Sequence, residues 1–243
     1  KKSHRLALPV VPRKAQEEVS RLWPWVRLAG AALILAAVIA QLSVTINGAI
    51  DNHRDVATTA VNFVSFFTIQ ANLIAMVTLA IGAFLSWRRT AGDSREPSWF
   101  ATLLASASTY MIVTGIVYNT LLRGVELPQG TTVPWSNEVL HVIAPLILLL
   151  DVLTAPARRG LGWGRLLTIA AYPIAWVIYT LIRGPLTVNP VTGENWWYPY
   201  PFLNPHLVPG GFAGVAGYIV AIAIAIVAVG ALVLWWGRRR ARA

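Results

Sequence analysis

The chain has 243 residues, of which 56% are hydrophobic and only 12% are charged. Soluble domains usually carry about 25% charged residues, so this composition excludes an ordinary soluble protein and indicates a polytopic membrane protein. The formal net charge of +10 does not indicate nucleic-acid binding, because the basic residues form short clusters beside apolar runs. The chain has no cysteine, which excludes disulfides and thiolate chemistry.

Six apolar stretches follow one another along the chain. A helix needs about 20 apolar residues to cross the hydrocarbon core of a bilayer. Stretches of roughly this length occupy residues 26–47, 61–87, 100–122, 133–153, 164–182 and 212–236. We therefore expect an all-α fold, with residues 1–243 forming a single domain of six transmembrane helices. A basic segment, 1–24, precedes the first span, and an aromatic and proline-rich loop, 183–211, precedes the last.

The Lys and Arg residues predict how the spans are oriented. Basic clusters lie in segments 1–24, 88–95, 158–165 and 238–242, all of which would face the same side of the membrane. The opposite side carries Arg54, Arg123 and Arg183. The positive-inside rule then places both termini in the cytoplasm.

Four spans carry a polar stripe in the half that would lie nearer the outer surface. Residues three or four apart share a face of a helix. The stripes are Gln41 and Thr45; Ser65, Thr68 and Asn72; Tyr110, Thr114 and Tyr118; and Asn137, Glu138 and His141. Lipid cannot satisfy such groups, so the stripes should face one another inside the bundle.

Within these stripes, His141 and Thr68 suggest a chemical function. An ionisable residue inside a membrane is costly, which makes His141 a functional candidate. At 1.5 Å per residue, Thr68 and His141 would lie about 10 and 12 Å below the outer surface. A hydroxyl is a weak nucleophile until a base takes its proton, and histidine suits that role at neutral pH. We expect the hydroxyl and a ring nitrogen within about 4 Å. The simpler interpretation is a Thr bonded to its own helix and a His that only packs.

Other polar residues can be given supporting roles around this pair. Asn72 and Asn119 are candidate oxyanion donors, and Asn137 or Glu138 could orient the imidazole. Tyr118 should line a cavity formed by spans two to four. Arg123 or Arg183 at its mouth could pair with a substrate carboxylate. Pro145 has no N–H and should leave the carbonyl of His141 free, with a bend in the helix.

The loop 183–211 has two interpretations. Its residues Trp196, Trp197, Tyr198, Tyr200 and Phe202 resemble an aromatic belt at the headgroups, which is the interpretation we prefer from sequence. The alternative is a lid over a cavity that opens outward.

Two short motifs and one loop segment resemble a known family. Residues 67–72, FTIQAN, and residues 135–141, WSNEVLH, resemble the androgen-induced protein family, which includes the androgen-dependent regulator of tissue factor pathway inhibitor and bacterial six-span relatives. Residues 197–203, WYPYPFL, look like the family's Tyr-Pro-Phe motif. The animal members are intramembrane threonine hydrolases that cleave fatty acid esters of hydroxy fatty acids. The resemblance places their Thr on Thr68 and their His on His141, but Glu138 replaces the first His of the animal Asn-His-x-x-His pattern.

Together these observations predict a lipid esterase of the bacterial plasma membrane. It would act on fatty acyl esters with Thr68 as nucleophile and His141 as base. The four histidines show no metal-ligand spacing, and we expect no metal or cofactor. The alternative is a non-enzymatic transporter or sensor of a lipophilic ligand that uses Glu138 and His141, although no internal repeat of the transporter kind is visible.

Overall fold

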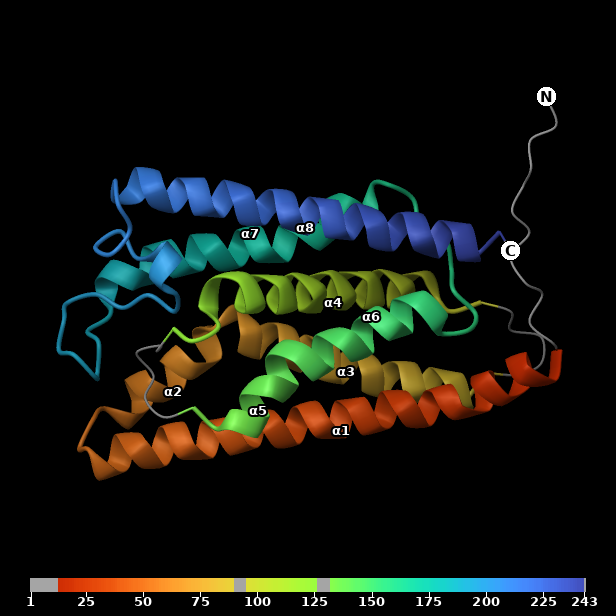
Figure 1. The fold of residues 1–243 in the computed structure, drawn as a ribbon, viewed down its shortest axis with the longest axis horizontal. Coiled ribbons are helices and arrows are strands. Elements are labelled where there is room, and N and C mark those ends of the chain that lie inside the picture. Colours follow the sequence, from red (N-terminus) through yellow and green to blue (C-terminus); the bar gives the residue numbers. More distant parts are fainter. Residues whose placement is uncertain (1–12, 90–94, 126–131, 243) are drawn as a thin grey trace.

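The computed structural model describes residues 13–89, 95–125 and 132–242, with the main chain alone for residues 13–20. Within these ranges the chain is helical and contains no strand. The α-helices are α1 (Arg13–Asp51), α2 (Val56–Ser65), α3 (Phe67–Trp87), α4 (Ser98–Val117), α5 (Pro134–Glu138), α6 (Ala144–Thr154), α7 (Arg165–Arg183) and α8 (Phe212–Arg240) (Figure 1). The π-helical turns η1 (Tyr118–Leu122) and η2 (Val139–Ile143) and the 3₁₀ turns η3 (Gly184–Leu186) and η4 (Pro201–Leu203) complete the fold. The part of the predicted basic segment before residue 13 lies outside the described residues.

Six helical segments are long and apolar enough to cross a membrane. They are Arg21–Asp51, Phe67–Trp87, Ser98–Leu122, Pro134–Thr154, Arg165–Leu186 and Phe212–Arg240. Each corresponds to one of the six predicted spans, so the predicted all-helical fold is confirmed, and the six helices suggest a multi-pass membrane protein.

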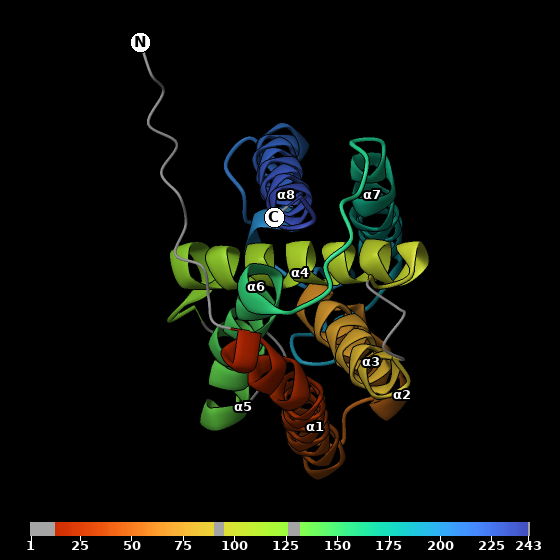
Figure 2. The same cartoon turned by 90° about the vertical axis from the view of Figure 1, so that its right-hand side faces the viewer.

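Helix α4 lies at the centre of the bundle. Figure 2 shows α7 and α8 on one side of α4 and α1, α3 and α6 on the other. In its most apolar 18-residue window α4 is 72% buried, compared with 17% for the span of α7 and 22% for α8. The buried run from Ala105 to Thr109 consists of Ala, Ser and Thr, whose small side chains allow neighbouring helices to approach closely.

The second predicted span is interrupted, which differs from the expected continuous helix. Helix α2 ends at Ser65, Phe66 is extended (φ −66°, ψ 129°), and α3 begins at Phe67. The break occurs without Gly or Pro because side chains bond the freed carbonyls: Gln70 Nε2 donates to Val64 O (2.8 Å) and Trp176 Nε1 donates to Ser65 O (3.0 Å). Broken helices are tolerated in membranes when neighbouring side chains satisfy the main chain in this way.

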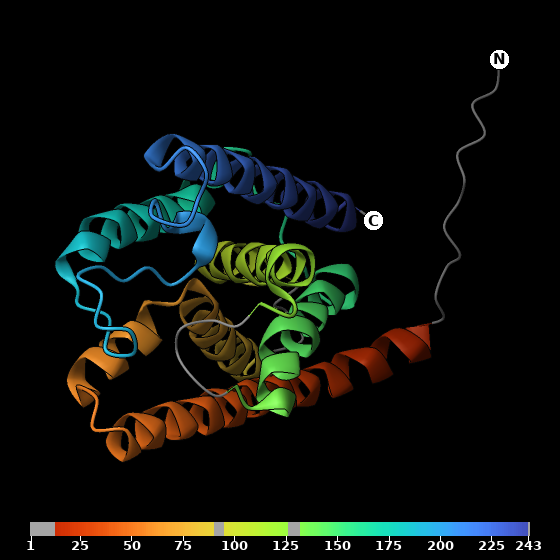
Figure 3. The same ribbon diagram turned by 60° about the vertical axis from the view of Figure 1, so that its left-hand side comes forward.

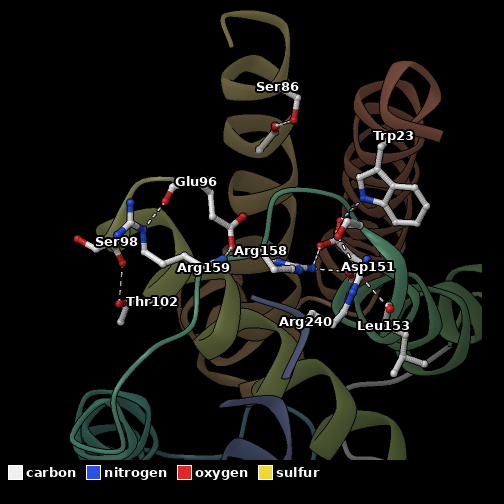
Figure 4. A network of polar contacts seen from close by, with 12 residues as sticks. Trp23, Ser86, Glu96, Ser98, Thr102, Asp151, Leu153, Arg158, Arg159 and Arg240 are labelled. Atoms are coloured by element: carbon white, nitrogen blue, oxygen red, sulfur yellow. Dashed lines mark hydrogen bonds and ion pairs between the residues drawn. The ribbon is translucent and has the colours of Figure 1, made fainter. Parts of the chain in front are cut away.

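The two ends of the bundle differ in character. The start of α1 and the end of α8 lie at one end, while α2, α5 and the α7–α8 loop lie at the other (Figures 1 and 3). At the first end, buried Asp151 accepts hydrogen bonds from Trp23 Nε1 (2.8 Å) and Arg27 Nε (2.7 Å) and also pairs with Arg158 (Figure 4). Arg158 in turn lies 3.6 Å from Glu96. This network joins α1, α6 and the loops before α4 and α7.

At the opposite end, the α7–α8 loop folds back onto the bundle. Trp197, Tyr198, Tyr200 and Leu203 are 1–5% exposed. The ring of Phe66, at the helix break, meets Trp197 and Tyr200 edge-on at 5.6 and 5.5 Å between ring centroids. Three of the five aromatics of the predicted headgroup belt, Trp197, Tyr198 and Tyr200, therefore pack against protein and cover the end of the bundle, whereas Trp196 and Phe202 are half-buried.

Candidate active site

Thr68 lies in the first turn of α3, directly after the helix break. Its side chain is buried, with 7% of the residue exposed. Its main-chain N–H belongs to the group of helix-start donors that have no partner within the helix. That N–H donates to the hydroxyl oxygen of Tyr200 (3.1 Å), and the Thr68 hydroxyl lies 3.1 Å from the same atom. The interpretation that Thr68 only bonds its own helix is not what the structure shows.

His141 lies in the π-helical turn η2. Its Nδ1 lies 2.9 Å from the main-chain oxygen of Asn137, a group that only accepts, so Nδ1 carries the proton and Nε2 has the free lone pair. The ring stacks on Tyr118 at 3.9 Å between centroids. The imidazole is thus oriented by the main chain of Asn137 and by Tyr118, and not by the side chain of Asn137 or Glu138. The Asn137 amide instead donates to the Tyr118 hydroxyl.

The main chain around Pro145 differs from the predicted free carbonyl. The N–H of Ala144 donates to Val139 O, which widens the helix by one residue at η2. The carbonyl of His141 accepts a long hydrogen bond of 3.5 Å from Asn119 Nδ2. A neighbouring side chain thus partly replaces the bond that Pro145 cannot make.

Thr68 and His141 line the same cavity, of about 180 Å³. Gln41 and Thr45 of α1 and Tyr118 of η1 also line it, so polar stripes from four spans meet there. The Thr68 hydroxyl bonds to Tyr200 and the His141 ring bonds to Asn137, and no direct hydrogen bond joins Thr68 to His141 in the described structure. The expected separation of about 4 Å stays a prediction.

A second cavity, of about 190 Å³, lies beside the first and is almost wholly apolar. Its walls come from α4, α7, α8 and the loop that contains η4. Four residues line both cavities: Thr68, Tyr118, Leu122 and Tyr200. Ile174 of α7 and Val227 of α8, which also line the apolar cavity, are 54% and 47% exposed, so this cavity lies close to the outer surface of the bundle. The predicted cavity was assigned to spans two to four, whereas its apolar part is built mainly on spans three, five and six.

The predicted oxyanion donors are engaged with the main chain. Asn72 Nδ2 donates to Thr68 O (2.9 Å) and Leu140 O (3.1 Å), which ties α3 to η2. Asn119 Nδ2 donates to Gly115 O at 2.8 Å. Both residues hold the helices that carry Thr68 and His141 in place.

The two arginines proposed for the cavity mouth already have partners. Arg123 makes a bidentate pair with Glu138 (3.0 and 3.2 Å) and bonds to Asn119 Oδ1 (2.9 Å), and its bond with Glu138 raises the pKa of the Arg123 guanidinium. The Arg123 and Glu138 side chains are about half exposed, at 48% and 46%. Arg183 donates to Asn62 Oδ1 (2.7 Å) and lies over the ring of Trp197.

The polar stripes predicted from sequence do face inward on three spans. The buried members are Gln41, Thr45, Ser65, Thr68, Asn72, Tyr110, Thr114 and Tyr118. Glu138 on the fourth span is the exception, because its carboxylate turns to Arg123 at the surface. Tyr200 was not predicted as a site residue. Its segment stood out only as part of the aromatic loop and through the Tyr-Pro-Phe resemblance, and nothing in the sequence paired it with Thr68.

No protein-family model matches this chain, and comparisons with curated proteins and with solved structures also find no match.

Proposed function

We propose that this protein is a membrane-embedded lipid esterase with Thr68 as nucleophile and His141 as general base. The observation that carries the proposal is the pair of adjoining cavities, one polar and one apolar, with Thr68 on the boundary between them. An ester of a fatty acid has this bipartite character, because a polar carbonyl group is joined to a long apolar chain. The substrate class would be fatty acid esters of hydroxy fatty acids or similar acyl esters, as the resemblance to the intramembrane threonine hydrolases suggests.

The residues support an acyl-transfer reaction in two halves. The Thr68 oxygen would attack the ester carbonyl carbon while its proton passes to the free Nε2 of His141. His141 would return that proton to the leaving alcohol as the C–O bond breaks, leaving an acyl group on Thr68. Water would then attack the acyl carbon while its proton passes to His141, and His141 would return that proton to the Thr68 oxygen as its bond to the acyl carbon breaks and the fatty acid leaves. The Thr68 hydroxyl must turn from Tyr200 toward His141 for the first step.

The charge pattern supports an orientation with both termini in the cytoplasm of a bacterial cell. The start of α1 and the end of α8 share one end of the bundle, where the Arg-rich segments also lie. In this orientation the polar cavity faces the outer half of the plasma membrane. Acyl substrates would reach the apolar cavity sideways from the bilayer, between α7 and α8.

The decisive experiment is active-site labelling of the purified protein with a lipophilic fluorophosphonate. An activated Thr68 should be phosphonylated in the wild type, as located by peptide mass spectrometry, and Thr68→Ala should remain unlabelled. Thr78→Ala is the matched control, since Thr78 is a buried threonine of the same helix whose hydroxyl bonds Ile74 O. Equal labelling of wild type and Thr68→Ala, or ester turnover by Thr68→Ala, would overturn the mechanism. Binding of acyl lipids without turnover would favour the transporter or sensor alternative.

A further inference from the structure

Tyr200 comes from the loop between α7 and α8, yet its hydroxyl is the hydrogen-bond partner of the Thr68 hydroxyl. The residue is 5% exposed, and its hydroxyl oxygen lies 3.1 Å from both the hydroxyl and the main-chain N of Thr68. The ring is held by Phe66 at 5.5 Å and by Phe202, stacked at 5.1 Å with an angle of 5° between planes. The hydroxyl is therefore fixed in position rather than free to rotate into solvent.

The hydrogen-bond capacity of this hydroxyl allows it to donate at the reacting atom. A main-chain N–H only donates, so the Tyr200 oxygen accepts from Thr68 N and keeps its own hydrogen for another acceptor. Thr68 Oγ1 is within reach of that hydrogen. Burial raises the pKa of the Tyr200 phenol above its ordinary value, so the group stays protonated at neutral pH and does not act as a base.

The helix break adds to the donor strength of Tyr200. Helix α3 begins at Phe67, so the Tyr200 oxygen lies at the positive end of the helix dipole. There it accepts a hydrogen bond from the Thr68 N–H, which has no partner within the helix. An oxygen that accepts a hydrogen bond polarises its own O–H, which makes it a stronger donor. The start of α3 thus acts on the site through the tyrosine hydroxyl.

We propose that Tyr200 is a catalytic residue of the esterase, whose hydroxyl donates to the oxyanion that forms when Thr68 attacks an ester carbonyl. In that step the bond from Thr68 Oγ1 to the carbonyl carbon forms, the π pair moves onto the carbonyl oxygen, and the Thr68 proton goes to His141. Tyr200 turns its hydrogen from Oγ1 to the new oxyanion, which is bonded to the same carbon, and keeps its proton throughout. The inference rests on the proposed function.

The test is Tyr200→Phe, which keeps the ring between Phe66 and Phe202 and removes only the hydroxyl. Loss of one oxyanion donor lowers kcat by about 10²–10³-fold, and we expect a drop of this order with little change in KM. Tyr198→Phe is the matched control, because Tyr198 is a buried tyrosine of the same loop whose hydroxyl has no hydrogen-bond partner within the described residues. It should keep wild-type kcat. A Tyr200→Phe enzyme with kcat within a few-fold of wild type would overturn the inference.

A second variant covers the case in which Tyr200→Phe does not fold. Replacing Tyr200 by 3,5-difluorotyrosine keeps the hydroxyl but makes it more acidic. We expect kcat to decline at alkaline pH as the fluorinated phenol ionises, and no such decline with the same replacement at Tyr198. Identical pH profiles for the two replacements would contradict a donor role.

The outcomes separate this inference from the proposed function. If the wild type neither hydrolyses acyl esters nor reacts with the fluorophosphonate, or if Thr68→Ala remains active, the proposed function fails. If the wild type is active, Thr68→Ala is dead and Tyr200→Phe is normal, only the role of Tyr200 fails.

Discussion

At the scale of single residues, the imidazole of His141 can accept a proton at only one of its two ring nitrogens. Nδ1 is engaged with the Asn137 carbonyl, and stacking on Tyr118 fixes the ring plane. Only Nε2 can accept a proton, and it belongs to a ring that lines the same cavity as Thr68. A histidine that acts as a catalytic base needs a second group to hold it in one tautomer, and the Asn137 carbonyl does this for His141.

The first prediction concerns the two residues as a unit. Thr68→Ala and His141→Ala should each lower kcat for acyl ester hydrolysis by roughly 10³-fold or more, and the double variant should be little worse than either. Thr68→Ser should retain part of the activity because it keeps the hydroxyl. The measurement is steady-state hydrolysis by purified, folded variants. Additive losses in the double variant would show that the two residues do not act together.

The second prediction concerns Glu138. Its carboxylate pairs with Arg123 in a half-exposed position, and such surface pairs contribute little to stability. Glu138→Gln should therefore retain most of the activity and fold normally, as checked by kcat and thermal unfolding. A loss as large as that of His141→Ala would instead mean that Glu138 sets the charge of the imidazole.

Sequence reasoning reached some site residues and not others for a physical reason. Helical spacing places Thr68 and His141 on inward-facing stripes, because lipid cannot satisfy polar groups. Spacing says nothing about an irregular loop, so the contact of Tyr200 with Thr68 could not be derived. Likewise, the pairing of Arg123 with Glu138 depends on side-chain geometry that periodicity does not encode.

At the scale of helices, the interruption at Phe66 was the main feature that the sequence did not reveal. A predicted second span of 61–87 is longer than a bilayer needs, but it contains no proline and no glycine near the break. The interruption depends on donors from elsewhere, above all Trp176 of α7. Tertiary contacts therefore overrode a locally helical sequence.

The third prediction concerns the network that joins α1 to α6. Asp151→Asn would leave buried Arg27 without its carboxylate partner and Arg158 with Glu96 alone, and removing one member of a buried ion pair costs about 3–5 kcal/mol. The free energy of unfolding in mixed micelles should fall by that order. Asp51→Asn, at the exposed end of α1, is the control and should change little. Equal stability of the two variants would contradict the role assigned to the network.

The fourth prediction concerns the wall of the apolar cavity on α8. Ala223→Phe should fill part of the cavity and lower kcat/KM for long acyl chains by roughly tenfold relative to short ones. Ala221→Phe adds the same ring to an exposed position of α8 that does not line the cavity, and should leave chain-length preference unchanged. If both variants shift the preference equally, the cavity is not the acyl site.

At the scale of the whole molecule, composition predicted the main architecture. Six spans are predicted from the length of the apolar runs, and the structure has six helices long and apolar enough to be these spans. The packing order was not predictable, because the hydrophobic stretches are alike. The small residues of α4 suit it to the centre, but they do not specify which helices surround it.

The fifth prediction concerns orientation, and the absence of native cysteine makes it simple to test. A membrane-impermeant maleimide should label Thr192→Cys, in the α7–α8 loop, on intact spheroplasts. Gly162→Cys, between α6 and α7, should react only after permeabilisation, and a Cβ there meets no neighbour within 4 Å. The reverse pattern would place both termini outside.

The contact between Thr68 and Tyr200 spans 132 residues of chain and joins the second span to the loop before the last. The first five spans are synthesised before that loop exists, and α8, which forms part of the apolar cavity, follows later still. A nascent chain thus carries Thr68 into the membrane without the tyrosine or the cavity wall that complete the candidate site. If the protein is an esterase, hydrolysis of the surrounding lipids waits until synthesis has finished.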